Sequence, residues 1–255
     1  VRTLKTSVLL YPEASYSFDG TATPLPESIG KCVKALNVPV VMIRTYGAFA
    51  RDPLYNGLQK RRAKVSAQMQ CLLSSSDVAE RNVAEINERI FSAFRFDNFR
   101  WQEENGVSVS EPFRADGLNR VLYKCPHCGT EGETEGRGTE LICRDCGVRY
   151  RLTELGALEC ENAEAKFTHV PDWYAWERAC VREELEQGSY LLDAAVSICV
   201  MVNFRQICRV GEGRLRHDAN GFRLTGCGGK LDFTQKPETS YSLYADYFWY
   251  ELGDM

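Results

Sequence analysis

One stretch near the start of the chain decides the predicted fold: residues 8–47 read VLLYPEASYSFDGTATPLPESIGKCVKALNVPVVMIRTYG. Residues 7–11 and 38–43 are short, nearly continuous apolar runs. Between them, residues 26–37 place apolar side chains three and four positions apart, the spacing of one helix face, and Asn37 is a plausible stop. Strand, helix and strand in this order form a βαβ unit, and strands that are apolar on both faces are typical of parallel sheets. The sequence therefore predicts an α/β fold with a parallel or mixed sheet.

The following residues extend this predicted domain. Residues 64–73 alternate between apolar and polar side chains, which predicts a half-exposed strand at a sheet edge. Asp77 and Glu80 have the spacing of a capping box, and the apolar residues after them predict a helix that reaches Phe94. We expect this first domain to cover residues 1–105.

Two matching cysteine pairs follow. Cys125-Pro-His-Cys128-Gly and Cys143-Arg-Asp-Cys146-Gly are separated by fourteen residues. Each CxxC turn can direct two thiolates at one point, and four thiolates in a tetrahedron suit Zn²⁺. The alternatives are a redox pair or a disulfide. The spacing predicts a zinc ribbon over residues 119–158, with a structural Zn²⁺ because no coordination position stays open. We expect His127, inside the first pair, to be exposed.

The C-terminal third predicts a different architecture. Pro171 and Asp172 are typical helix openers, and from residue 189 onward short apolar runs alternate with tight-turn signals such as Asn220-Gly221. We expect residues 165–255 to form a helix and a mainly-β module, an antiparallel barrel or sandwich. The aromatic residues of segment 240–254 are either the core of this module or a lipid-facing surface.

Composition and charge narrow the possible partners. The net charge is −4 and the pI about 5.6, and the ribbon's long loop carries three glutamates, so we expect no binding to nucleic acid. No apolar run approaches the length of a membrane helix. Seven of the eleven cysteines stand alone in apolar segments, a pattern typical of free thiols in a reducing compartment. We therefore expect a cytoplasmic location.

The polar loop after the first apolar run is the candidate binding segment. In parallel α/β sheets, ligands bind beyond the carboxyl ends of the strands, and the loop after Tyr11 would lie there. Glu13 offers a carboxylate, and Ser15, Tyr16 and Ser17 offer hydroxyl donors and acceptors. The alternative is a surface loop whose polar residues make turns.

A resemblance favours the first interpretation. Tyr11-Pro12-Glu13-Ala14-Ser15-Tyr16-Ser17 resembles the Phe-Pro-Glu-Gly-Thr-Arg-Ser block of the 1-acylglycerol-3-phosphate (glycerolipid) acyltransferase family, and Val38-Pro39-Val40 resembles the Val-Pro-Val strand that follows that block. The resemblance covers residues 5–95 and implies the C-terminal part of such a domain, in a bacterial subgroup. It implies that Glu13 helps to organise the acceptor pocket, that the acyl donor is acyl-CoA or an acyl carrier protein, and that the acceptor is a lysophospholipid or another hydroxyl compound. It further implies peripheral contact with the inner face of the membrane.

Two departures from the family pattern limit these implications. Tyr16 replaces the block's phosphate-binding arginine, so either the acceptor is not a lysophosphatidate or Arg44 or Arg51 supplies the charge from the next loop. The family's catalytic His-x-x-x-x-Asp is absent, because the residues five positions after His127, His169 and His217 are not aspartates. We therefore expect a fragment whose dyad lies upstream of Val1, inactive alone.

Other interpretations stay open. A non-catalytic adaptor, in which the ribbon and the β module bind a protein partner, is the main alternative, and a zinc-ribbon nucleic-acid binder is a third. The basic cluster of residues 60–64 is either a solvated face or a site for anionic lipid headgroups or a CoA phosphate. His169 and Asp172 are interpreted as a helix cap and hinge.

Overall fold

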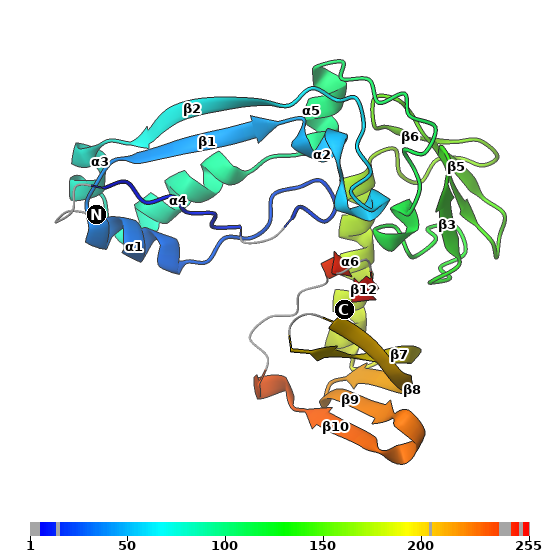
Figure 1. Ribbon diagram of the computed structural model, residues 1–255. Helices are drawn as coiled ribbons and strands as arrows, with labels where there is room; N and C mark the ends of the chain where they lie inside the picture. Colours follow the sequence, from blue (N-terminus) through cyan, green and yellow to red (C-terminus); the bar gives the residue numbers. More distant parts are fainter. Residues whose placement is uncertain (1–5, 14–15, 204–205, 240–245, 250–251, 255) are drawn as a thin grey trace. The chain divides into compact units, whose positions relative to one another are not determined.

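The structure is a computed structural model of the 255-residue chain, and it describes residues 6–13, 16–203, 206–239, 246–249 and 252–254. The chain divides into two compact units, Val1–Ala175 and Trp176–Met255 (Figure 1). Each unit mixes helices with antiparallel sheets, so the predicted α/β character of the chain is confirmed at this coarse level.

Unit 1 begins with two strands and the helices around them. Its elements up to residue 105 are α1 (Ser28–Leu36), β1 (Val40–Tyr46), α2 (Ala48–Arg51), η1 (Leu54–Asn56), β2 (Ser66–Leu73), α3 (Ser75–Glu80), α4 (Val83–Phe94) and α5 (Asn98–Glu104). As predicted, α1 ends at Asn37, which adopts a left-handed conformation with φ of 46°.

The predicted parallel pairing is wrong. β1 pairs with β2 in antiparallel register, and residues 7–11 form no strand. The physical reason is that an apolar run by itself fixes neither burial nor pairing. Val8, Leu9 and Leu10 are 53, 67 and 50% exposed, and the partner of a strand depends on which other strand reaches its edge. The predicted capping pair of Asp77 with Glu80 is wrong: Ser74 with Asp77 caps α3. Asn82 with Glu85 separately caps α4, so the predicted helix up to Phe94 is two helices.

The core of this region lies between one face of β1–β2 and helices α1 and α4. Buried Val33, Leu73, Val78, Ile86 and Ile90 form one cluster. The two helices approach closely at Gly30, where an added Cβ would lie 2.4 Å from the Asn87 Oδ1 atom. The Asn87 side chain accepts the Gly30 N–H at 2.7 Å and donates to the Glu27 carbonyl at 2.8 Å, which fixes the position of α1 on α4.

A buried polar network ties the first hundred residues to the segment that precedes the cysteine pairs. The Arg61 guanidinium donates to the side chains of Tyr55 and Asn56 and to the Arg114 carbonyl, all at 2.9–3.2 Å. Arg114 in turn donates to the Leu152 carbonyl at 2.7 Å. Arg61, a member of the basic cluster at residues 60–64, is therefore a structural residue.

The rest of unit 1 is a small ribbon. After η2 (Leu118–Arg120), four strands pair in sequential antiparallel order: β3 (Thr134–Arg137), β4 (Glu140–Cys143), β5 (Arg149–Leu152) and β6 (Leu158–Cys160). Helix α6 (Val170–Gln187) begins in unit 1 and continues into unit 2. Its buried Trp173 packs with Tyr150 at a ring-centroid distance of 4.9 Å.

Unit 2 contains a second sequential antiparallel sheet, of β7 (Leu192–Val202), β8 (Gln206–Asp218), β9 (Gly221–Gly226) and β10 (Leu231–Gln235), with η3 (Cys227–Gly229) before β10 and η4 (Pro237–Thr239) after it. A separate pair, β11 (Asp246–Trp249) and β12 (Leu252–Asp254), follows. The predicted antiparallel β character of this region is confirmed. Most of the aromatic segment 240–254 lies outside the described residues, and neither interpretation of it is tested.

Candidate metal centre

The two cysteine turns have the same backbone geometry. In each, the first cysteine, Cys125 or Cys143, donates its N–H to the carbonyl five residues ahead, at 2.9 and 3.0 Å. Gly129 and Gly147 close each turn by donating back to that cysteine's carbonyl, both at 2.9 Å. Both glycines have φ near +75° (78° and 75°), a conformation that side chains with a Cβ rarely adopt. The matched glycines of the sequence are therefore required by the turns.

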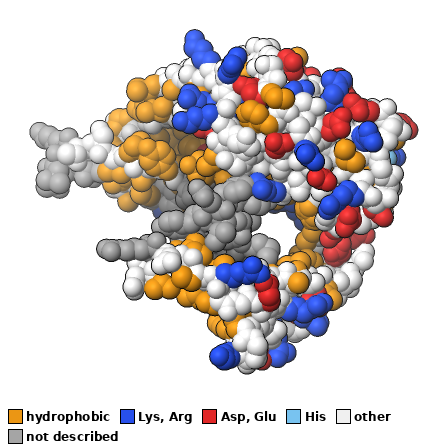
Figure 2. All heavy atoms as spheres, turned by 45° about the vertical axis from the view of Figure 1, so that its right-hand side comes forward, with side chains coloured by type: hydrophobic (Ala, Val, Ile, Leu, Met, Phe, Trp, Pro, Cys, Tyr) orange, Lys and Arg blue, Asp and Glu red, His pale blue; other side chains and the backbone are white. Residues whose placement is uncertain are grey.

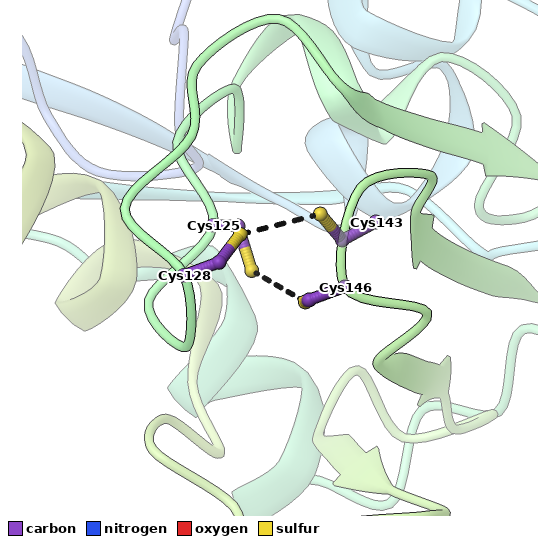
Figure 3. Close-up of side chains that lie close together, drawn as sticks. All are labelled: Cys125, Cys128, Cys143 and Cys146. Atoms are coloured by element: carbon purple, nitrogen blue, oxygen red, sulfur yellow. Dashed lines mark hydrogen bonds between the residues drawn. The ribbon is translucent and has the colours of Figure 1, made fainter.

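These turns bring the four predicted ligands together. The Sγ atoms of Cys125, Cys128, Cys143 and Cys146 all lie within 4.8 Å of one another (Figure 3). The Cys125–Cys146 and Cys128–Cys143 sulfur pairs, each spanning both turns, are 3.6 and 3.7 Å apart. A tetrahedral ion with metal–sulfur bonds of about 2.3 Å would separate its sulfurs by about 3.8 Å. A disulfide would need about 2.05 Å, so the arrangement fits a metal ion.

The sulfurs differ in their surroundings. Cys125 and Cys143 are buried, whereas Cys128 and Cys146 are exposed. Burial raises the pKa of the Cys125 thiol, and partial desolvation of the sulfur atom raises that of Cys146 although the residue as a whole is exposed. Hydrogen bonds from the Thr130 side chain and backbone lower the pKa of Cys128 to about 7. One thiolate is thus readily available near neutral pH, and a bound cation would favour ionisation of the others.

Aromatic residues support the first cysteine turn. The Trp173 Nε1–H donates to the carbonyl of Lys124, the residue before Cys125, at 3.0 Å. The Tyr150 hydroxyl accepts the Lys166 N–H at 3.0 Å and lies at hydrogen-bonding distance, 2.9 Å, from the His127 Nε2 atom. The expectation that His127 is exposed is wrong, because this contact leaves it half-buried, and burial with nearby Lys166 lowers its pKa.

Among the described residues, the four cysteines are the one group of three or more potential ligands placed to hold a metal ion. The donor set is entirely sulfur, which favours soft or borderline metals over Mg²⁺ or Ca²⁺. Four protein ligands complete a tetrahedron, so the site can cross-link the two turns and leaves no position for a substrate.

The candidate acceptor loop makes local contacts. The Glu13 carboxylate accepts from the Thr23 N–H at 3.0 Å and from its hydroxyl at 3.3 Å, and the Ser17 hydroxyl donates to the Thr21 carbonyl at 2.7 Å. Tyr16 is exposed, and Ser15 lies outside the described residues. These bonds order the loop without identifying a ligand.

The remaining candidate, Arg44, lies on β1. Its guanidinium carbon is 5.4 Å from the centroid of the Phe96 ring. This position is compatible with a cation–π contact, and no carboxylate of the described residues forms an ion pair with Arg44.

One group of residues was missed by sequence reasoning. His169 and Asp172 lie beside Asp97, which is more than seventy residues away in the chain. The His-x-x-Asp spacing was the only local signal, and nothing in the sequence indicates that Asp97 joins them.

Comparison with known proteins identified no relative: no protein-family model, no curated protein and no solved structure matches this chain. No helix in the described part of the chain combines the length and the apolar character needed to cross a membrane.

Proposed function

We propose that the four cysteines hold a structural Zn²⁺ ion, and that the ribbon it organises is appended to part of an acyltransferase for glycerolipid-type hydroxyl acceptors. The sulfur geometry carries the first half of this proposal. The second half rests on the resemblance of residues 11–17 and 38–40 to the glycerolipid acyltransferase blocks. The two halves can therefore fail separately.

Zinc would act here by joining the turn before β3 to the turn between β4 and β5. The strands of this sheet have only three or four residues each, so each pair of strands forms few backbone hydrogen bonds. A fourfold cross-link compensates, because metal binding free energy becomes folding free energy in small zinc domains.

One observation supports the acyltransferase half: β1 begins at Val40, the last residue of the Val38-Pro39-Val40 stretch that resembles the family's apolar strand. In the proposed reaction, an acceptor hydroxyl attacks the thioester of acyl-CoA or an acyl carrier protein. Its proton passes to a histidine base supplied outside these 255 residues, and the free thiol leaves. Contact with the inner membrane face would bring the lipid acceptor.

An adaptor is the second candidate, and one observation favours it. The outer face of β1–β2 carries Val41, Ile43 and Met69, with exposed fractions of 53, 55 and 72%. Hydrophobic side chains also gather at the left of the surface view, whereas charged side chains are scattered over much of the rest (Figure 2). Exposed apolar faces mark interaction sites. An acyltransferase would cover this face with its remaining strands or helices, and an adaptor would cover it with a protein partner.

The test uses the full reading frame expressed with membranes, and measures acyl transfer from acyl-CoA to lysophospholipid acceptors. We expect Glu13→Ala to abolish turnover while zinc content and folding are unchanged. The matched control is Glu27→Ala, an exposed glutamate whose side chain does not cap α1. Equal turnover in Glu13→Ala and wild type would contradict the assigned role of Glu13. No turnover with any acceptor, despite an intact upstream dyad, would favour the adaptor.

A further inference from the structure

A cluster of charged side chains outside the metal centre lies between α5 and the first turn of α6. His169 precedes α6 and is only 15% exposed. Its Nε2 atom is 3.2 Å from Asp97 Oδ2, and its Nδ1 atom is 3.1 Å from Asp172 Oδ2. Asp97 caps α5 by accepting the Arg100 N–H, and Asp172 lies in the first turn of α6. Both contacts have ion-pair distances, but neither ring nitrogen is aligned for a hydrogen bond to any described residue. One imidazole therefore lies between two carboxylates at the beginnings of both helices.

The groups around the imidazole are few. From α5, Arg100 places its Nε atom 3.3 Å from Asp97 and a terminal nitrogen 3.5 Å from Asp172, and the Phe99 ring meets His169 edge-on at 6.4 Å. From α6 comes Asp172. A hollow of about 330 Å³ borders the cluster; its lining includes Glu103, Glu104, Thr168 and the chain at residues 156–157.

The protonation state of the imidazole determines how many carboxylates it can donate to. A neutral imidazole carries one N–H and one lone pair, so it can donate to only one carboxylate and presents a lone pair to the other. The imidazolium carries two N–H groups and can donate to both. We propose that Asp97, His169 and Asp172 form a proton-operated latch that holds the first turn of α6 on α5 while the imidazole is charged, and that loses one of its two contacts when the proton leaves.

The electrostatic surroundings agree with this direction. Burial disfavours the charged ring, but the nearby carboxylates of Asp97 and Asp172 outweigh it and raise the His169 pKa above its usual value. A raised pKa in the folded state means that the latch stabilises the fold fully below the ordinary histidine pKa. This contribution is lost as the pH rises through the folded-state value. The latch depends neither on the metal nor on the proposed acyl transfer.

Nuclear magnetic resonance of the imidazole protons tests the first half of the proposal. The chain has three histidines, so three single substitutions assign all the signals. Burial lowers the pKa of both His127 and His217. We expect His169 to titrate last, at the highest pH of the three. Titration of His169 at or below either of the others would overturn the proposal.

Amide exchange tests the second half. The Trp173 N–H donates to the His169 carbonyl at 3.2 Å and reports on the first turn of α6. We expect its protection factor, corrected for the intrinsic pH dependence of exchange, to fall about tenfold as His169 loses its proton. Asp172→Asn should remove this pH dependence, because only one carboxylate remains. The control Glu164→Gln, which removes an exposed charge, should retain it. Protection independent of pH in the wild type would overturn the latch.

Discussion

The chain contains two four-stranded antiparallel sheets with the same sequential order and opposite characters. The ribbon sheet β3–β6 has strands of three or four residues, yet Leu141, Tyr150, Leu152 and Leu158 are all buried. The sheet β7–β10 has strands of up to thirteen residues, yet among the large apolar side chains of these strands only Ile198 is buried. Strand length and burial are therefore unrelated in this molecule.

The difference lies in what surrounds each sheet. The ribbon is flanked by the cysteine cluster, by buried Leu118 and Leu122 and by Trp173. In β7–β10, Ala194, Leu215, Leu224 and Phe233 are cross-strand neighbours on one half-exposed face, and pairs such as Arg223–Asp232 lie on the other. Backbone pairing alone does not exclude water, so packing or a metal cross-link must complete a sheet.

The largest expected effect follows from removing the cross-link. We predict that a chelator, or Cys143→Ser, unfolds the ribbon while β7–β10 keeps its strands, because structural zinc contributes on the order of 10 kcal/mol in zinc-finger peptides. Amide hydrogen exchange, followed separately for the strands of β3–β6 and of β7–β10, reports on each sheet. The control is Cys160→Ser, on β6 and outside the cluster. A ribbon that stays folded without metal would contradict the claim that the metal cross-link stabilises this sheet.

Truncating one large aromatic side chain in each unit should give unequal results. Trp173→Ala removes a buried ring and its hydrogen bond to the Lys124 carbonyl, and we expect a loss of about 3–5 kcal/mol in unfolding free energy. Phe233→Ala truncates a ring that is 52% exposed, and we expect a much smaller loss. Chemical denaturation measures both. Equal losses would mean that β7–β10 is as closely packed as the ribbon.

The contact between α1 and α4 should tolerate no extra atom. Gly30→Ala favours helix formation by up to about 1 kcal/mol, but its Cβ would clash with Asn87 and the Val83 carbonyl. We predict a net loss of about 1–3 kcal/mol, the usual cost of overpacking. Lys31→Ala, at an exposed position of the same helix, is the control. A stabilising Gly30→Ala would show that the helices can separate at little cost.

The smallest effect is expected on the charged face of β7–β10. Arg223 and Asp232 form an ion pair in which Arg223 lowers the pKa of Asp232 and Asp232 raises the pKa of Arg223. Both side chains are well exposed. Solvent screening makes such pairs weak. We predict that Arg223→Ala leaves the thermal midpoint unchanged at physiological salt. A clear drop that high salt abolishes would reveal a stronger pair than the exposure of these groups suggests.

The sequence predicted the parts of this molecule that depend on short-range spacing. Two CxxC turns with matched glycines specify their own geometry, so the cluster at residues 125–146 could be located in advance. The capping residues near Asp77 gave a helix but not its interruption at Asn82, because consecutive capping signals compete. The pairing of β1 was mispredicted because an apolar run does not specify which strand will pair with it.

Contacts between residues far apart in the sequence could not be predicted, because they depend on how helices and strands pack. His169 was interpreted from its neighbour Asp172 alone, and the approach of Asp97 depends on how α5 packs. The acceptor-loop role of Glu13 stays a prediction, since the contacts with Thr23 order the loop whether or not it binds a substrate.

The central claim is that four cysteine thiolates hold one metal ion, and metal analysis of the purified chain tests it most directly. Native mass spectrometry with X-ray absorption at the zinc edge would measure the stoichiometry and the ligand set. We predict one zinc ion per chain, coordinated by four sulfurs at about 2.3 Å, retained in Cys160→Ser and lost or altered in Cys143→Ser. A metal-free folded chain, or zinc bound through nitrogen or oxygen ligands, would contradict the account.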